Sequence, residues 1–146
     1  MFNFFMPRKS RMCRNMIYTL LPFDKIQSMI LDTNSYALID VRTKSEYDFM
    51  HVINAINIPV AKLRMCENEY RNKKGIIVYC SSGQRSKEAI MILNSMGYSN
   101  IYIWQYGAIT NFPYKDMIVI WKYYLCNKHF WQIVLIANKK CENRLG

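Results

Sequence analysis

The fold is decided by one stretch of the sequence, Ile76-Ile77-Val78-Tyr79-Cys80-Ser81-Ser82-Gly83-Gln84-Arg85-Ser86. Its first four residues form a continuous apolar run, which is typical of a central strand in a parallel sheet because both faces of such a strand are covered. A loop of small residues follows, and residues 85–96 then place apolar side chains at helical spacing. The stretch therefore predicts a strand, a short loop and a helix, with Cys80 at the carboxyl end of the strand.

The segments on either side continue this alternation. The expected strands are 18–21, 37–41, 55–58 and 101–104, and the expected helices are 22–31, 44–49 and 60–72, with a turn or short helix over 107–112. Thr43 stands three residues before Glu46, which is the spacing of a capping box, and Gly97 stands where the helix over 85–96 should stop. Strands that alternate with helices predict an α/β domain with a mostly parallel sheet.

Composition and charge narrow the class of protein. The chain of 146 residues fits one ordinary domain, and its 51% apolar and 21% charged residues exclude a collagen-like or wholly disordered protein. The net charge of +10 comes largely from the flanks, because residues 1–16 hold four basic residues and no acid, and residues 114–146 hold six basic residues against two acids. Such flanks usually solvate the termini, so no specific nucleic-acid partner is expected, and weak contact with nucleic acid or an anionic membrane is the alternative.

Cysteine usage indicates where the protein works. The five cysteines are an odd number, they include no C-x-x-C pair, and they show no metal-ligand spacing to either histidine. Neither a disulfide framework nor a metal site is expected, and no cofactor is implied. The apolar residues 1–6 precede the first basic residues instead of following them, which argues against secretion. A reducing, cytoplasmic location is the prediction.

Residues 117–136 are apolar enough to raise the question of a transmembrane helix. Lys122 and the polar cluster 127–129 interrupt the run, and a Lys near the bilayer centre costs about 2.5 to 3.5 kcal/mol, so no transmembrane span is expected. The many β-branched and aromatic residues fit two strands around a polar turn at least as well as a helix. We interpret this segment as a packed or self-associating extension, with a membrane-surface segment as the alternative.

The surroundings of Cys80 favour a reactive thiolate. The ligand crevice of an open α/β sheet lies outside the carboxyl ends of its strands, where Cys80 is expected. Backbone N–H groups from residues 81–86 and the positive end of the following helix dipole favour an anion there. Arg85 adds a positive charge, and Gly83 gives the loop the conformational freedom to curl around the sulfur.

This loop resembles the active-site loop of the rhodanese superfamily of single-domain sulfurtransferases, because residues 80–86 fit the pattern C-x-x-G-x-R followed by Ser or Thr throughout. Asp40-Val41-Arg42 with Glu46 and Tyr47 is similar to the D-V-R-x-x-x-E-Y/F motif of that family. Residues 51–59 resemble its G-H-I-x-G-A-x-N-I-P motif, and residues 104–112 its closing L-x-G-G-x-x-x-W motif. Three glycines of these patterns are replaced, by Met50, Asn54 and Tyr106.

The resemblance implies three parts of the chain: a basic segment 1–17, a rhodanese-like domain 18–113, and an extension 114–146 of unknown role. It also implies an open parallel sheet with helices on both faces. The implied activity is sulfurtransfer, in which Cys80 takes sulfane sulfur from thiosulfate or a persulfide, becomes a persulfide itself, and passes the sulfur to a thiol, to cyanide or to a protein acceptor.

The resemblance assigns further residues to this site. Arg85 would attract the anionic donor and Ser86 would donate a hydrogen bond to the sulfur. The residues expected to bind the substrate are Ser81, Ser82, Gly83, Gln84, Arg85 and Ser86. Asp40, Arg42 and Glu46 are expected to form an ion pair that fixes the loops, and His51 to be a hydrogen-bonded scaffold residue. Cys66 is either a resolving thiol or, as lone helix cysteines usually are, an apolar filler.

Two other functions remain open. Cysteine phosphatases use C-x5-R, whereas only four residues separate Cys80 from Arg85, so this loop is one residue short for a phosphoryl group. A non-catalytic rhodanese-type binding module, or a module that only carries a persulfide, is the other alternative. Loss of the cysteine would mark a binding module, and Cys80 is present.

Overall fold

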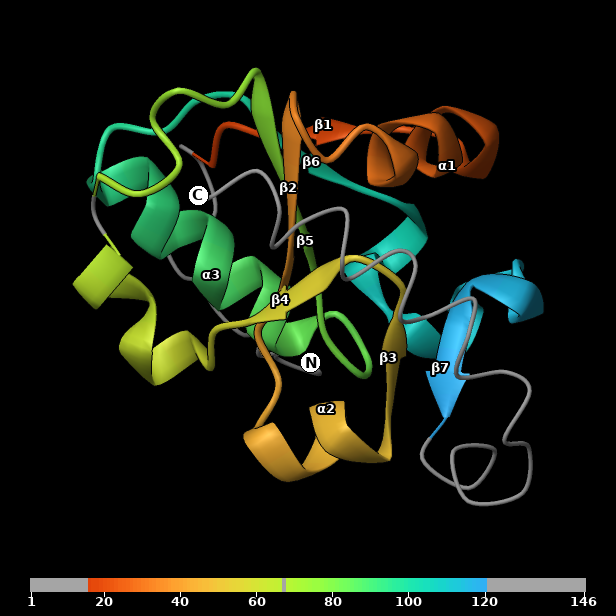
Figure 1. Ribbon diagram of the computed structural model, residues 1–146. Coiled ribbons are helices and arrows are strands. Elements are labelled where there is room, and N and C mark those ends of the chain that lie inside the picture. The colour runs from red at the N-terminus through yellow and green to blue at the C-terminus, as the bar shows by residue number, and fades with distance from the viewer. Residues whose placement is uncertain (1–15, 67, 121–146) are drawn as a thin grey trace, which may run out of the picture.

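The computed structural model describes residues 16–66 and 68–120, and its centre is a five-stranded sheet (Figure 1). The strands are β1 (Thr19–Leu20), β2 (Tyr36–Asp40), β4 (Ala55–Asn57), β5 (Gly75–Tyr79) and β6 (Ile101–Ile103). They lie in the order β1-β6-β5-β2-β4, and every neighbouring pair is parallel. The predicted α/β class with a parallel sheet is confirmed, and β5 is the central strand.

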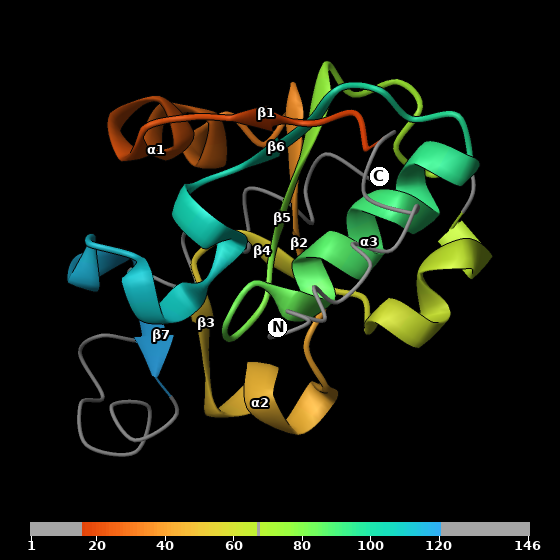
Figure 2. The same cartoon turned by 180° about the vertical axis from the view of Figure 1, so that it is seen from behind.

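Helices cover both faces of this sheet. Figure 1 shows α1 (Phe23–Leu31) on one side and α3 (Gln84–Ser95) with the 3-10 helix η2 (Val60–Cys66) on the other, and Figure 2 shows the same two layers from behind. Along β5 the side chains alternate, so that Ile77 and Tyr79 pack in the core on the α1 side, whereas Ile76 and Val78 pack on the α3 side. Cys80 continues this alternation and belongs to the α3-side core.

Among the residues that the structure describes, the largest fully buried side chain lies in the α1-side core. Trp104 is fully buried there and its ring lies 5.1 Å, between centroids, from both Tyr79 and Phe112. The chain around these residues forms three short 3-10 helices, η3 (Gln105–Gly107), η4 (Ile109–Asn111) and η5 (Lys115–Met117). This compact segment follows β6 and runs past the carboxyl end of β5.

A second, two-stranded sheet lies beside α2 (Lys44–Phe49). The strand β3 (Met50–Val52) pairs antiparallel with β7 (Ile118–Ile120), and the two strands are adjacent in both views (Figures 1 and 2). The sequence indicated no strand over residues 50–52. One of the strands suggested within residues 117–136 is present as β7, and residues 121–136 lie outside the described part of the chain.

The predicted helix over residues 60–72 is wrong. The chain forms a 3-10 helix over 60–66 and turns over 68–72. Val60, Leu63 and Cys66 are the residues of η2 that face the core, and they recur every third position. A repeat of three matches the 3-10 helix, in which residues i and i+3 eclipse, whereas an α-helix would turn every third residue progressively away from the core.

The replaced motif glycines cause little backbone strain where the structure describes them. Asn54 has φ = 64°, the left-handed conformation that Asn tolerates better than other side-chain-bearing residues, and its Nδ2 donates to the Ile30 carbonyl at 3.2 Å. Met50 has φ = −161°, extended backbone that any residue adopts. The backbone conformation at both positions is therefore one that the residue present can adopt. Among the described residues no helix combines the length and apolarity needed to cross a bilayer.

Candidate active site

Cys80 directly follows β5, at the carboxyl end of the parallel sheet, as predicted. Its backbone is held on both sides by the segment after β6, because its N–H donates to the Gly107 carbonyl at 2.9 Å and its carbonyl accepts from the Ile109 N–H at 2.8 Å. Trp104 fixes that segment in turn, with Nε1 donating to the Ala108 carbonyl at 2.8 Å. Cys80 is only 1% exposed, so its sulfur lies in a closely fitted position.

The loop after Cys80 turns back over the sulfur. Gly83 has φ = 94°, and its N–H donates a hydrogen bond to Cys80 Sγ at 3.0 Å. Gly83 is also the residue that precedes the first turn of α3. The sulfur consequently faces a backbone N–H and the positive end of a helix dipole, and both stabilise negative charge on it.

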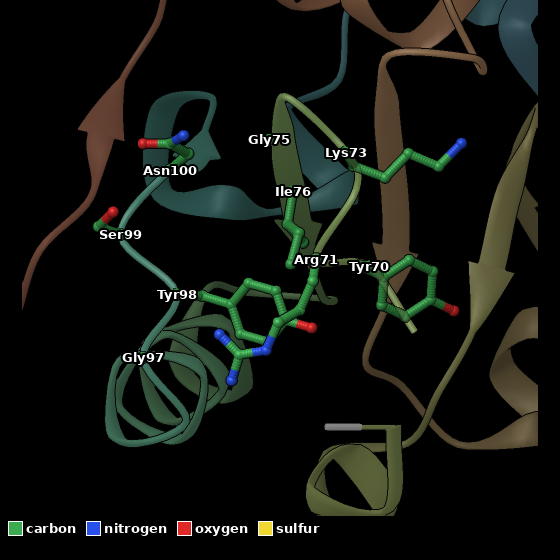
Figure 3. A pocket seen from close by; sticks show the side chains of 9 residues that line it. All are labelled: Tyr70, Arg71, Lys73, Gly75, Ile76, Gly97, Tyr98, Ser99 and Asn100. Carbon is green, nitrogen blue, oxygen red and sulfur yellow. The ribbon is translucent and has the colours of Figure 1, made fainter. Parts of the chain in front are cut away.

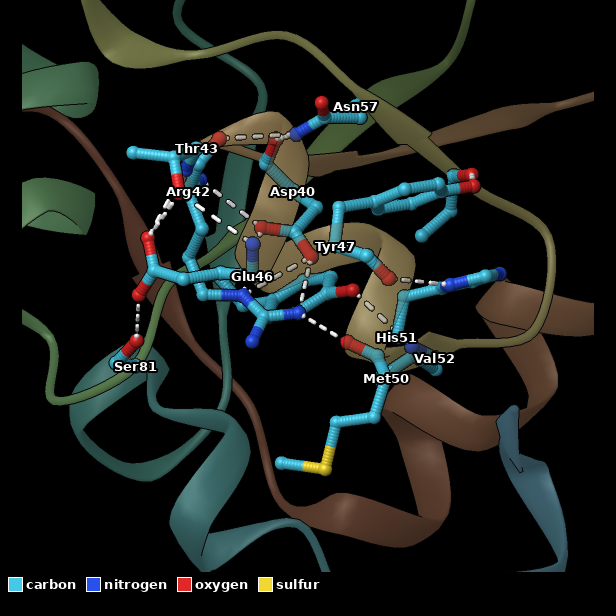
Figure 4. Close-up of polar contacts among 12 residues, drawn as sticks. Asp40, Arg42, Thr43, Glu46, Tyr47, Met50, His51, Val52, Asn57 and Ser81 are labelled. Carbon is cyan, nitrogen blue, oxygen red and sulfur yellow. Dashed lines mark hydrogen bonds and ion pairs between the residues drawn. The ribbon is translucent and has the colours of Figure 1, made fainter. Parts of the chain in front are cut away.

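A carboxylate from α2 holds this loop. Glu46 forms a two-point ion pair with Arg85, with Nη1 to Oε2 at 2.6 Å and Nη2 to Oε1 at 2.7 Å. Ser81 Oγ donates to Glu46 Oε1 at 2.8 Å, and the Thr43 N–H donates to Oε2 at 3.0 Å within the predicted capping box (Figure 4). These hydrogen bonds, that from Arg85 first, hold the pKa of Glu46 far below its ordinary value despite partial burial.

One predicted pairing is corrected, and the predicted role of Arg85 in attracting the donor stays a prediction. In the structure both Nη atoms of Arg85 bind Glu46, and Nη2 also donates to Ser81 Oγ at 3.0 Å. Glu46 was expected to join the ion pair of Asp40 and Arg42, but it pairs with Arg85 instead. The reason is positional: the capping box places the Glu46 carboxylate at the start of α2, where Ser81 and Arg85 approach it.

Asp40 and Arg42 do pair with each other, as expected. Arg42 Nη2 lies 2.7 Å from Asp40 Oδ2, Nε lies 3.0 Å from Oδ1, and the two side chains are 4% and 0% exposed. Arg42 Nη2 also donates to the Met50 carbonyl at 2.6 Å (Figure 4). The pair therefore links the end of β2 to the start of β3, and it supports the turn from which α2 begins.

His51 packs within the scaffold. Its Nδ1 lies 2.8 Å from the Tyr47 carbonyl, and its ring stacks on the Tyr47 ring with centroids 3.9 Å apart. Burial lowers the pKa of His51, although its backbone hydrogen bond opposes this shift. Tyr47 in turn donates its hydroxyl to the Ala55 carbonyl at 2.8 Å. These contacts join α2, β3 and β4, and none of them involves the sulfur.

The structure does not show the expected hydrogen bond from Ser86 to the sulfur, and a hydrogen bond from Ser86 to a persulfide stays a prediction. Ser86 is 1% exposed and its Oγ donates to the Gly107 carbonyl at 2.9 Å. The same carbonyl also accepts from the Cys80 N–H. The closing motif pointed to Gly107, but no pattern pointed to Thr110, whose Oγ1 donates to the Ser81 carbonyl at 3.3 Å.

The remaining predicted residues lie at the surface of the loop or in η2. Ser82 and Gln84 are exposed at the surface of the loop, so these two positions present neutral side chains to solvent. Cys66 is half-buried in η2 and, like Cys80, is a free thiol. Burial, with a contribution from Glu69, raises the pKa of Cys66, which fits its interpretation as an apolar filler. No group of His, Cys, Asp and Glu side chains within the described ranges could hold a metal ion.

A separate polar cavity of about 150 Å³ lies at the other end of β5, where Gly75 and Ile76 begin the strand (Figure 3). Two basic side chains that line the cavity already bind backbone carbonyls. Arg71 Nη2 donates to the Met96 carbonyl at the end of α3, and Lys73 Nζ donates to the Thr33 carbonyl after α1. Such cations stabilise the carboxyl ends of helices. This cavity contains no nucleophilic cysteine, and the candidate active site is the loop around Cys80.

Comparisons with known proteins agree with this geometry. The family model for the rhodanese-like domain matches residues 23–108. The chain is similar to thiosulfate sulfurtransferase PspE of Escherichia coli, at 38% identity over 65 residues that cover 43% of this chain and 62% of the relative. It is also similar to thiosulfate:glutathione sulfurtransferase of Saccharomyces cerevisiae, at 36% identity over 76 residues that cover 43% of this chain and 55% of the relative.

A solved structure gives the same result for the fold. The rhodanese-related protein of Thermoplasma volcanium has a TM-score of 0.54 and 29% sequence identity, and the match covers 65% of this chain and 90% of that protein. The chain spans only a little more than half the length of the two curated relatives.

Proposed function

Because this chain belongs to the rhodanese-like family, we propose that it is a sulfurtransferase that carries sulfane sulfur as a persulfide on Cys80. One observation supports this proposal above the others, namely the 3.0 Å hydrogen bond from the Gly83 N–H to Cys80 Sγ at the start of α3. A backbone donor and a helix terminus stabilise a thiolate before transfer and a persulfide anion after it.

The reaction has two balanced steps. In the first, the Cys80 thiolate attacks the outer sulfur of thiosulfate, a new S–S bond forms, and the bond to the sulfonate sulfur breaks with its electron pair leaving on sulfite. In the second, a thiolate or cyanide attacks the outer persulfide sulfur, and the electron pair of the Cys80 S–S bond returns to Cys80 as thiolate. No net oxidation occurs, and neither step needs a metal or an organic cofactor.

The burial of Cys80 favours the transfer of a single sulfur atom over the transfer of a larger group. Cys80 is 1% exposed, and a persulfide adds a single sulfur, whereas a phosphoryl group would bring three further oxygens that need donors. Burial also protects a persulfide from water and from stray thiols. This favours sulfurtransfer over a phosphatase, as does the loop length.

The proposal extends to the sulfur donor, the sulfur acceptor and the location of the protein in the cell. Thiosulfate or a low-molecular persulfide is the donor, and a thiol, cyanide or a protein thiol is the acceptor. Ser81, Gly83 and Arg85 shape the loop, while Asp40, Arg42 and His51 support it. A cytoplasmic location is supported by the unpaired cysteines Cys66 and Cys80, because a reducing compartment keeps thiols free.

Mass spectrometry of the intact protein tests the proposal. Incubation with thiosulfate should add about 32 Da, the mass of one sulfur atom, and peptide analysis should place it on Cys80. Subsequent cyanide should remove the added mass and yield thiocyanate. A protein that gains no mass with thiosulfate, thiosulfonates or cysteine persulfide would refute it, and phosphate release from an aryl phosphate by that protein would support the phosphatase.

A further inference from the structure

The charge beside the sulfur is balanced within the protein. Arg85 is the only basic residue of the loop 80–86, and both of its Nη atoms bind the Glu46 carboxylate at 2.6 and 2.7 Å. The two side chains are 31% and 34% exposed, so the pair is partly solvated. The exposed loop residues Ser82 and Gln84 are neutral.

A bidentate pair acts on a distant ligand as a dipole, whose potential falls off faster with distance than that of a single charge. Hydrogen bonds from Arg85 to Glu46 raise the pKa of Arg85, with a smaller contribution from Cys80, although burial opposes the shift. Glu46 consequently cancels much of the positive charge that Arg85 would otherwise direct at the donor. What remains at the sulfur is the Gly83 N–H and the end of α3.

We propose that Glu46 determines the charge preference of the sulfur donor: by neutralising Arg85 it leaves a site that selects donors through backbone N–H groups and shape. This inference rests on the proposed sulfurtransferase activity. Such a site gains little from a second negative charge on the donor, so it suits donors with a net charge of −1, such as thiosulfonates and cysteine persulfide. Glu46 is here a positioning residue, because it acts on the donor through Arg85.

Two donors that differ by one charge provide the test. Thiosulfate is a dianion and leaves as sulfite, and the methanethiosulfonate anion carries one charge and leaves as methanesulfinate, while each gives its terminal sulfur to the Cys80 thiolate. The measured quantity is the ratio of kcat/KM for thiosulfate to kcat/KM for methanethiosulfonate. Comparing this ratio between variants removes the intrinsic difference in reactivity between the donors.

Glu46→Gln removes the negative charge and keeps the shape of the side chain. It should raise the ratio about three- to tenfold, the size expected for one partly solvated charge. Arg85→Ala leaves Glu46 unpaired and should lower the ratio by a similar factor. The double variant has no net charge at the pair, so its ratio should return to within about twofold of wild type.

A purely structural role for Glu46 gives a different pattern. Loss of the Glu46–Arg85 ion pair would then slow sulfur transfer from both donors by the same factor in every variant, and the ratio of the two kcat/KM values would not change. An unchanged ratio in Glu46→Gln, or a double variant whose ratio stays displaced, would overturn the inference. Asp48→Asn is the matched control, because Asp48 is an exposed acid on the same helix that pairs with Lys44, and its ratio should stay within about twofold of wild type.

The salt dependence of the ratio offers a second measurement. Between ~0.01 and ~0.5 M NaCl the ratio should fall less in wild type than in Glu46→Gln, because the rest of the net charge of +10 is screened alike in both proteins and only the variant has an unneutralised Arg85. Equal falls in the two proteins would overturn the inference. If wild-type protein accepts sulfur from neither donor, the proposed sulfurtransferase activity itself fails, which is a separate result from an unchanged ratio.

Discussion

The Gly83 N–H donates a hydrogen bond to Cys80 Sγ at 3.0 Å, and it does so from a backbone with φ = 94°. A residue with a Cβ rarely adopts this conformation, so the orientation of the N–H depends on the glycine. The same residue precedes the first turn of α3, so one conformation both starts the helix and places a donor on the sulfur.

Gly83→Ala should therefore lower both stability and sulfur loading. A left-handed conformation costs a side-chain-bearing residue about 1 to 2 kcal/mol, which urea unfolding measures. Gly97→Ala is the control, because Gly97 has φ = 85° at the other end of α3, far along the chain from the sulfur. Both variants should lose similar stability, but only Gly83→Ala should load sulfur more slowly. Equal loading rates would show that the Gly83 N–H is dispensable.

Replacement of the nucleophile should abolish transfer. Cys80→Ser should gain no sulfur from thiosulfate and form no thiocyanate, because a hydroxyl cannot carry sulfane sulfur through the cycle. Cys66→Ser, the matched change at the other described cysteine, should keep the mass gain and most of the rate. Sulfur transfer by the Cys80→Ser variant would show that Cys80 is not the nucleophile and that another thiol carries the sulfur.

Ser86→Ala should lower the stability of the protein and leave sulfur loading nearly unchanged. Its Oγ binds the Gly107 carbonyl and not the sulfur, so its loss should cost about 1 kcal/mol of unfolding free energy. Sulfur loading per folded molecule should stay within a few-fold of wild type. A loss of loading without a loss of stability would mean that Ser86 turns toward the persulfide during the reaction.

Asp40→Asn should be among the most destabilising single changes in the domain. Asp40 and Arg42 are buried together, and removal of one charge leaves the other without a partner at a cost of about 3 to 5 kcal/mol. The exposed pair of Lys44 and Asp48 offers the comparison, because Asp48→Asn should cost less than about 1 kcal/mol. Urea unfolding of both variants tests this, and similar costs would contradict the assigned burial.

Glu46 should make stability depend on pH in acid. Its pKa lies well below the ordinary value of 4.5 in the folded protein, so the folded state resists its protonation more than the unfolded state does. The stabilisation is complete above about pH 4.5 and is lost as the pH falls toward the folded pKa. The stability difference between wild type and Glu46→Gln should shrink below that pH. A difference that is constant from pH 6 to pH 3 would contradict the ion pair with Arg85.

Local patterns predicted the central part of the fold. The apolar run before Cys80 and the stripe that contains Ala89 and Leu93 identified β5 and α3 to within a residue, because each pattern reflects burial along one element. The capping box of Thr43 and Glu46 was also read correctly, since it involves residues three apart.

The partners across the site could not be read in the same way. Glu46 meets Arg85 from a position 39 residues earlier, and Ser86 meets Gly107 from 21 residues away. Sequence spacing says which groups can form ion pairs or hydrogen bonds, but the choice among several acceptors depends on how the elements pack. The short strand β3 escaped prediction for the same reason, because it exists through its pairing with β7.

The β3–β7 pairing shows that the folded domain extends beyond the residues that the family model matches. The family match ends at residue 108, yet Met117 is 6% exposed in the α1-side core and β7 covers an edge of β3. A fragment cut after the matched region would leave a hole in that core and an unpaired strand edge, which is a site for aggregation. Anyone who divides this gene for expression, or fuses a partner to the domain, should therefore place the junction after Ile120.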